Sequence, residues 1–236
     1  MGFAAIWRRR GLPARLLYPL SMIFYVLATL RRVLYRLGVL PVRHLPVPVV
    51  VVGNLTVGGT GKTPLIIHLA TSLRARGLQP GIVSRGYRGA AKAVVAVTPQ
   101  SDPAAVGDEP LLLARRSQCP VYVGRDRVAA GEALLASHPA CDVILADDGL
   151  QHYRLARDVE IAVFDERGIM NGWQLPAGPL REPVSRLAAA DAIVQNGVGS
   201  VSPAPTFTRP VFSMRLLGDS FYRLDNPQVI CPAGDF

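Results

Sequence analysis

The chain contains few cysteines and little aromatic character. Three of its 236 residues are cysteine, at positions 119, 141 and 231, and no two of them form a Cys-x-x-Cys pair. An odd number at wide spacing excludes a disulfide framework and gives no indication of a zinc site. Half of the residues are hydrophobic and 18% are charged, which excludes intrinsic disorder. We therefore expect a globular protein of a reducing compartment.

Negative charge is missing from the N-terminal part. No Asp or Glu occurs before Asp102, so the first hundred residues carry 14 of the 26 basic residues and no acid. Lysine is also scarce, since only Lys62 and Lys92 occur. This asymmetry predicts that the N-terminal side faces a polyanion or an anionic membrane surface.

A basic and apolar segment lies near the start of the chain. Residues 16–30 carry no charge and lie between arginines at positions 8–10 and 15 and arginines at positions 31, 32 and 36. Fifteen helical residues span about 22 Å, less than the roughly 30 Å of a hydrocarbon core. We predict a helix that lies in or dips into one leaflet, with its cations on anionic headgroups. The alternatives are a helix that packs on its own domain and a cleaved signal peptide, which the arginines after the apolar run oppose.

A glycine-rich loop follows a short apolar run. Residues 49–52 are four valines, typical of a strand buried on both faces, and residues 64–76 have the pattern of a helix. Between them, residues 53–63 read GNLTVGGTGKT, which matches the phosphate-loop pattern G-x-x-x-x-G-K-[ST] except at the first position. The predicted nucleotide-binding residues are Thr56, Val57, Gly58, Gly59, Thr60, Gly61, Lys62 and Thr63. Lys62 is expected to contact the β and γ phosphates, and Thr63 to bind Mg²⁺.

Apolar runs and helical stretches alternate along the rest of the chain. Runs at 81–84, 93–97, 121–123, 143–146, 160–164 and 192–194 predict strands, and residues 125–137 predict the clearest helix. This order predicts an α/β fold of the P-loop NTPase kind, with a mostly parallel, doubly wound sheet. We expect an N-terminal helix and linker over residues 1–46, a P-loop kinase domain over 47–200, and the start of a second, incomplete domain over 201–236.

Two pairs of acidic residues are candidates for the site. Asp147 and Asp148 end the run at 143–146, where carboxylates that hold Mg²⁺ beside a P-loop are expected; capping of the following turn is the alternative. Asp108 and Glu109 form a second acidic pair, which could simply begin a helix. His152, close behind the first pair, is a further candidate for the site.

The scarcity of lysine narrows the class of P-loop protein. A switch GTPase reads guanine with an Asn/Thr-Lys-x-Asp element, which neither lysine provides. A membrane-associated partitioning ATPase has a lysine where this chain has Val57. A small-molecule or lipid kinase remains, which its basic and apolar N-terminal segment would bring to a membrane substrate.

Five short motifs follow one another along the chain. They are VGNLTVGGTGKTP at 52–64, SRGYRG at 84–89, VGDEP at 106–110, DDGLQH at 147–152 and LPAGPLREP at 175–183. In this order they resemble the signatures of the tetraacyldisaccharide 4′-kinase family, the lipid A kinases of Gram-negative bacteria. The resemblance extends from about residue 10 to about residue 225 and includes the N-terminal helix.

The resemblance implies transfer of the ATP γ-phosphate to the 4′-hydroxyl of a tetraacylated glucosamine disaccharide 1-phosphate. The product, lipid IVA, would be made at the cytoplasmic face of the bacterial inner membrane, in lipid A biosynthesis. ATP and Mg²⁺ are the implied cofactors. An anionic membrane surface and the acylated disaccharide are the implied partners, without nucleic acid or an obligate protein partner.

The resemblance also implies roles for individual residues. Lys62 and Thr63 would serve the phosphates and Mg²⁺, Asp147 and Asp148 the metal, and Asp108 the deprotonation of the acceptor hydroxyl. The residues implied to bind substrate or line the cleft are Arg85, Tyr87, Glu109, His152, Arg181 and Glu182.

The last residues depart from the family pattern. Members of the family continue into a further domain with a histidine thought to pair with the aspartate of the Gly-Asp-Glu-Pro motif, and nothing after residue 225 matches it. We therefore expect nucleotide binding to be retained and lipid phosphorylation to be slow. The alternatives to an active kinase are a catalytically weak truncated homologue and another kind of membrane-associated P-loop ATPase.

Overall fold

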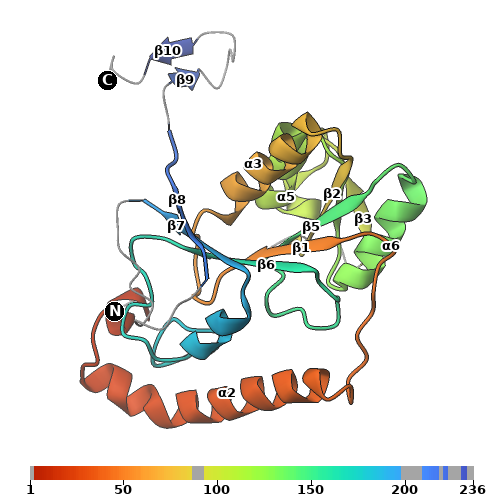
Figure 1. Cartoon of the computed structure of the whole chain (residues 1–236). Coiled ribbons are helices and arrows are strands. Elements are labelled where there is room, and N and C mark those ends of the chain that lie inside the picture. The colour runs from red at the N-terminus through yellow and green to blue at the C-terminus, as the bar shows by residue number, and fades with distance from the viewer. Residues whose placement is uncertain (1–2, 87–92, 198–208, 218–219, 223–229, 233–236) are drawn as a thin grey trace.

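An eight-stranded sheet forms the centre of the protein (Figure 1). The computed structural model describes residues 3–86, 93–197, 209–217, 220–222 and 230–232. The strand order is β3-β4-β2-β5-β1-β6-β7-β8. The strands are β1 Val49–Gly53, β2 Pro80–Ser84, β3 Val95–Val97, β4 Val121–Val123, β5 Val143–Asp147, β6 Val159–Phe164, β7 Ala192–Asn196 and β8 Val211–Met214. Every pairing is parallel except that of β3 with β4, which confirms the predicted fold class.

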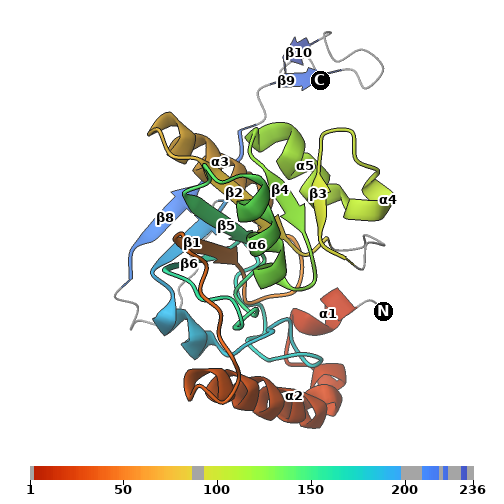
Figure 2. The ribbon, with the colours of Figure 1, turned by 90° about the vertical axis from the view of Figure 1, so that its right-hand side faces the viewer.

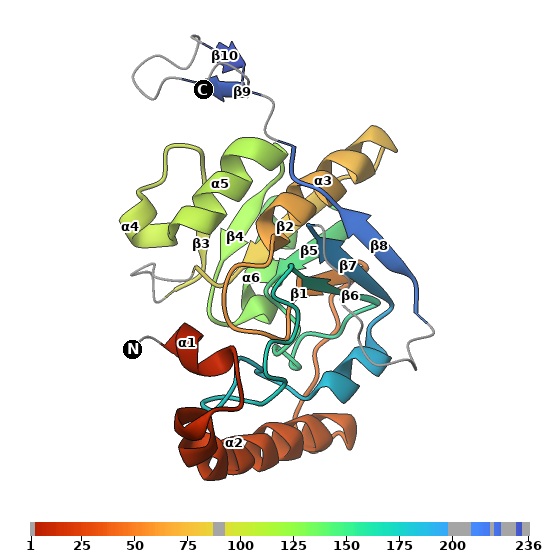
Figure 3. The ribbon, with the colours of Figure 1, turned by 90° about the vertical axis from the view of Figure 1, so that its left-hand side faces the viewer.

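Helices cover both faces of the sheet (Figures 2 and 3). On one face α3 (Lys62–Ala75) and α5 (Asp108–Ser117), preceded by α4 (Pro103–Val106), pack on one apolar core. On the other face α6 (Arg127–Ser137) and the 3₁₀ helix Val184–Ala189 pack on a second core. The central strands are buried on both sides because of these two layers, as their unbroken apolar runs predict.

The C-terminal part of the sheet was not predicted from the sequence. β8 pairs in parallel with β7, although it lies in residues 201–236, where a second domain was expected to begin. Its first three residues are exposed, so it lacks the buried apolar run that identified the other strands. β9 (Ser220–Tyr222) and β10 (Ile230–Pro232) form a separate antiparallel pair. The division of the chain into domains stays a prediction.

The N-terminal segment forms α1 (Phe3–Trp7) and α2 (Leu12–Arg36). The expected helix of fifteen residues was too short, because Arg15, Arg31, Arg32 and Arg36 lie inside a helix of 25 residues. Such a helix is about 37 Å long, so the argument from length against a membrane crossing no longer holds. α2 has the length and composition of a membrane-crossing helix, and only 11% of its most apolar window is buried.

One side of α2 packs against the loop at residues 171–183, along the base of the domain (Figure 1). The buried Ser21 hydroxyl donates to the carbonyl of Gln174 at 2.9 Å and accepts from the N–H of Ala177 at 2.9 Å. The ring of Tyr18 lies 4.7 Å from that of Trp173. The expected alternative, a helix packed on its own domain, therefore holds for this side of α2.

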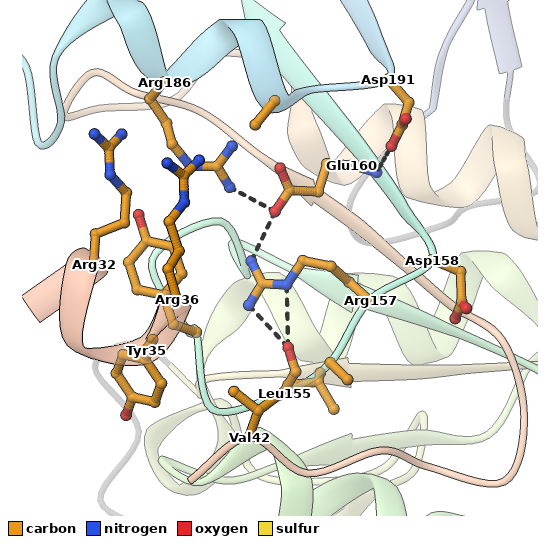
Figure 4. Close-up of a pocket in the computed structure, with 13 residues that line it drawn as sticks. Arg32, Tyr35, Arg36, Val42, Leu155, Arg157, Asp158, Glu160, Arg186 and Asp191 are labelled. Carbon is orange, nitrogen blue, oxygen red and sulfur yellow. Dashed lines mark hydrogen bonds and ion pairs between the residues drawn. The ribbon is translucent and has the colours of Figure 1, made fainter. Parts of the chain in front are cut away.

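The C-terminal half of α2 approaches a polar pocket of about 410 Å³ (Figure 4). Arg157 and Arg186 both bind the buried carboxylate of Glu160, at 3.0 and 2.5 Å. Arg32 and Arg36 of α2 line the same pocket. The end of α2 contacts the domain beside this pocket, where Arg31 donates to the carbonyl of Gln151 at 3.2 Å and the ring of Tyr35 lies 5.8 Å from that of Tyr153.

We predict that Ser21→Ala lowers the free energy of unfolding by about 1–3 kcal/mol, because the buried N–H of Ala177 loses its acceptor. Urea unfolding followed by circular dichroism measures the change. Thr71→Ala is the matched control, since the exposed Thr71 hydroxyl bonds, among the described residues, only to a carbonyl of its own helix. It should change stability by less than about 0.5 kcal/mol. Equal losses in the two variants would contradict the docking role of Ser21.

Candidate active site

The glycine-rich loop connects β1 to α3, which begins at Lys62. Gly58 and Gly61 have φ angles of +113° and +91°, which side chains with a Cβ rarely adopt. Thr56 stands where the usual pattern has glycine, but it has no positive φ and forms a bridge with Leu180 instead. The loop therefore does not require glycine at its first position.

A pocket of about 370 Å³ lies at this loop. It is lined by Val57, Gly58, Gly59, Lys62, Ser84, Arg85, Glu109, Asp147, Asp148 and Arg181. The carboxyl ends of the neighbouring parallel strands β1, β5 and β2 meet here, which is where ligands bind in open α/β sheets. Residues predicted from separate motifs thus lie in one pocket.

Asp148 is the centre of an ionic network in this pocket. Arg181 binds it with two hydrogen bonds of 2.9 and 2.8 Å, and Lys62 Nζ lies 3.7 Å from its Oδ1 and 3.3 Å from Asn54 Oδ1. Burial alone raises the pKa of Asp148. The hydrogen bonds and charge of Arg181 and the charges of Lys62 and Arg127 outweigh this effect and lower the pKa to about 2. Asp148 is therefore ionised at neutral pH.

Asp147 lies deeper, at the last position of β5. Its Oδ2 accepts a hydrogen bond of 2.9 Å from Ser84, while its buried Oδ1 has no partner among the described residues. Burial raises the pKa of Asp147 to about 6, against the opposing effects of Ser84 and Lys62. An unpartnered buried carboxylate oxygen is costly unless a ligand satisfies it.

The residues at this position fit a magnesium ion. Within the described ranges no three His, Cys, Asp or Glu side chains form a metal cluster. Mg²⁺ beside a nucleotide commonly uses one or two protein oxygens together with phosphate oxygens and water. The free oxygen of Asp147 and the hydroxyl of Thr63, at the start of α3, are the candidates for those protein ligands. Asp148, the third predicted metal ligand, already has both carboxylate oxygens bound by Arg181.

The remaining predicted residues lie in different places. Arg85 and Glu109 line the pocket. Asp108, the first residue of α5, is exposed and lies beside Glu109 without lining the pocket itself. Tyr87 lies outside the described residues.

Two predicted cleft residues do not line this pocket. Glu182 is buried, accepts a hydrogen bond of 2.6 Å from the Tyr153 hydroxyl and lies 3.3 Å from Arg186 Nε. His152 Nε2 accepts the backbone N–H of Arg127 at 3.3 Å, at the start of α6. Both side chains are committed to neighbouring buried contacts and lie outside the lining of the loop pocket. Their assignment to the substrate cleft stays a prediction.

Three residues of the site were not predicted. Asn54, Arg167 and Asn196 each donate a hydrogen bond to a carbonyl of the glycine-rich loop. Their positions in the chain could have identified them, since each residue follows or ends a strand whose carboxyl end lies at the glycine-rich loop. Arg167 and Asn196 lie outside the five motifs and bond to backbone atoms of the loop, while Asn54 lies within the first motif but was assigned no role.

A family model described as tetraacyldisaccharide-1-P 4′-kinase matches residues 13–230. The chain belongs to this family. A tetraacyldisaccharide 4′-kinase of Aromatoleum aromaticum is 58% identical over 94% of this chain and 66% of its own length. Another, of Herminiimonas arsenicoxydans, is also 58% identical, over 92% of this chain and 59% of its own length. The chain thus spans about two thirds or less of these relatives.

A solved structure of the family has the same fold. The "apo" form of LpxK from Aquifex aeolicus, in complex with ATP, matches with a TM-score of 0.76 and 35% identity. The match covers 86% of this chain and 64% of that one.

We predict that His152 makes the protein less stable in acid. Burial and then the charge of Arg127 lower its pKa from 6.5 to about 4, so the native state binds fewer protons than the unfolded state between these values. The free energy of unfolding therefore falls as pH drops from 6.5 to 4, by about 2–3 kcal/mol. His152→Gln keeps an acceptor for Arg127 and should flatten this part of the curve in urea titrations. Parallel curves for the two proteins would exclude the effect.

Proposed function

We propose that the chain binds ATP with Mg²⁺ in the loop pocket and transfers the γ-phosphate to the 4′-hydroxyl of a tetraacyl disaccharide 1-phosphate, giving lipid IVA. The observation that carries this proposal is the meeting of Lys62, Asp147, Asp148 and Arg181 around a glycine-rich loop in a member of this kinase family. Phosphoryl transfer depends mainly on positioning and charge neutralisation. Lys62, the carboxylates and a bound Mg²⁺ can together position the phosphates of ATP and neutralise their charge.

On the nucleotide side, Lys62 neutralises charge on the β and γ phosphates. Asp147 and the Thr63 hydroxyl would hold the magnesium ion, which supplies further positive charge to the phosphate oxygens. Asp148 stays ionised because Arg181 binds it with both terminal nitrogens. The pair keeps Lys62 at the pocket, since the Lys62 ammonium lies between Asp148 and Asn54.

On the acceptor side, Asp108 is the candidate general base. It is exposed beside Glu109, which lines the pocket. Its carboxylate has no hydrogen-bond or ion-pair partner within the ranges that the structure describes, so it is free to accept a proton from an incoming hydroxyl. Arg85 would contribute a cation next to the reacting phosphates.

The exposed side of α2 supports binding to a membrane. Leu16, Leu20, Ile23, Leu27 and Leu30 follow one another at helical spacing and are 51–72% exposed. We call these five residues the apolar stripe. Because α2 contacts the domain through its other side, a helix lying in one leaflet buries the stripe in lipid and keeps those contacts. The cytoplasmic face of the bacterial inner membrane is the proposed location, with an anionic lipid surface and the acylated disaccharide as partners.

The proposed reaction is tested by measuring transfer of phosphate from ATP to the lipid. The chain, radiolabelled ATP and the tetraacyl disaccharide 1-phosphate in detergent should yield a labelled lipid. Asp108→Asn should lower kcat by about 10²–10⁴-fold, because general-base assistance typically contributes that much. Absence of labelled lipid from the unmodified chain would refute the proposed reaction, and an unchanged kcat in the variant would refute the role of Asp108.

We expect Lys62→Ala to weaken ATP binding by about tenfold to a hundredfold, because it removes a charge-assisted phosphate contact. Isothermal titration calorimetry measures the dissociation constant. Arg76→Ala is the matched control, since it removes an exposed cation just after the other end of α3. Equal affinity of the Lys62 variant and the unmodified chain would remove the basis for nucleotide binding at this loop.

Replacing Leu20, Ile23 and Leu27 with glutamine should reduce binding to vesicles by more than about tenfold, because the stripe loses apolar area that lipid would bury. Flotation with phosphatidylethanolamine and phosphatidylglycerol vesicles measures binding. The control replaces Leu78 and Leu112, exposed apolar residues outside α2, with glutamine and should float like the unmodified chain. If the stripe variant also floats normally, another surface contacts the membrane.

A further inference from the structure

Successive carbonyl groups at residues 58–60 of the glycine-rich loop each accept a hydrogen bond from a side chain outside this stretch. The pairs are Gly58 with Asn54 Nδ2 at 3.2 Å, Gly59 with Arg167 Nη2 at 2.5 Å, and Thr60 with Asn196 Nδ2 at 3.3 Å. The donors come from three adjacent strands of the sheet, since they follow β1, follow β6 and end β7. Within the described residues, the N–H groups of residues 58–61 donate no hydrogen bond.

This arrangement matters because a phosphate loop binds through its N–H groups. A carbonyl oxygen turned toward a phosphate would place two negatively polarised oxygens together and oppose binding. A donor on the outer side of each carbonyl holds the peptide groups in the orientation that leaves their N–H groups free. The loop is then organised before the ligand arrives, which reduces the ordering cost of binding.

We propose that Arg167 and Asn196 are positioning residues that hold the carbonyl groups of the phosphate loop outward and so increase its affinity for the phosphates of a nucleotide. This rests on the proposed function, because it takes the loop to be a nucleotide site. Asn54 takes part as well. Its side chain also contacts Lys62 and Arg181, so its substitution would change several contacts at once.

Arg167 is itself held in place. Asp165 accepts from its Nε at 2.7 Å and from its backbone N–H at 3.0 Å. The guanidinium lies over Gly58, where an added Cβ would be 3.2 Å from Nη1. Gly58 therefore has two reasons to lack a side chain. Its φ is positive, and a Cβ would crowd the Arg167 guanidinium.

Asn196 connects the loop to the edge of the sheet. A Cβ on Gly61 would lie 2.5 Å from its Nδ2 and 3.0 Å from Met214 Cε. Met214 is the register partner of Asn196 in β8. The unpredicted strand β8 thus forms part of the support of the phosphate loop.

The test compares ATP affinity in Arg167→Met, Asn196→Ala and the unmodified chain by calorimetry. Each variant should raise the dissociation constant by about five- to tenfold, which corresponds to one lost hydrogen bond, without changing the melting temperature of the ligand-free protein. Asn196→Ala removes no charge, so its effect cannot be a loss of general electrostatic attraction. In turnover, KM for ATP should rise while kcat at saturating ATP stays the same.

Two further variants sharpen the result. Arg115→Met is the matched control, because Arg115 also donates to a backbone carbonyl, that of Pro99 at 2.9 Å, but far from the loop; it should bind ATP normally. Asn196→Asp should bind more weakly than Asn196→Ala, since a carboxylate cannot donate to Thr60 and adds negative charge near the phosphates.

The outcomes separate the two proposals. If the unmodified chain does not bind ATP, the proposed function fails and this inference fails with it. If the unmodified chain binds ATP and both variants bind it equally well, only the positioning role is overturned. A weaker affinity that comes with a lowered melting temperature, or that Arg115→Met shares, also overturns the positioning role.

Discussion

The contact between Arg181 and Asp148 is the interaction on which the proposed nucleotide site depends. Arg181 binds both carboxylate oxygens and the carbonyl of Asn54, and its own N–H donates to the Leu55 carbonyl at 2.7 Å. It therefore joins the end of β5 to the start of the glycine-rich loop. Asp148 adopts a φ of +49°, a conformation that costs a residue with a side chain some free energy. The paired guanidinium holds the side chain in this position and keeps the carboxylate charged.

The loop that carries Arg181 also carries the docking surface for the N-terminal helices. At one end, Pro179 accepts from the N–H of Val57 at 2.9 Å, beside the Thr56 bridge. At the other, Trp7 donates to the carbonyl of Pro176 at 2.9 Å, and Ser21 binds the backbone next to it. Residues 171–183 thus contact both the proposed phosphate site and the proposed membrane helix. Pro176, which contacts Trp7, and Pro179, which contacts Val57, are only three positions apart.

Features that depend on neighbouring residues in the chain could be predicted from the sequence. The four valines of β1, the glycine-rich loop and the paired acids after β5 each combine a strand pattern with a chemical group, so their places followed directly. Contacts that form only in three dimensions were missed. Arg167 and Asn196 bond to backbone carbonyls, and Glu182 turns toward Tyr153 rather than the pocket. β8 is mostly exposed and so lacks a buried apolar run. The length of α2 was underestimated because arginine was read as a boundary, although its long side chain can extend to water from within a helix.

The shared loop has a consequence for protein engineering. Deleting α1 and α2 is an obvious way to obtain a more soluble domain, since the apolar stripe lies on α2. Such a deletion would also uncover the ring of Trp173 and remove the acceptor of the Ala177 N–H. These residues lie a few positions before Arg181, so the shortened protein would lose packing and hydrogen-bond partners of the segment that anchors Asp148. Replacing the stripe residues in place would improve solubility without disturbing the nucleotide pocket.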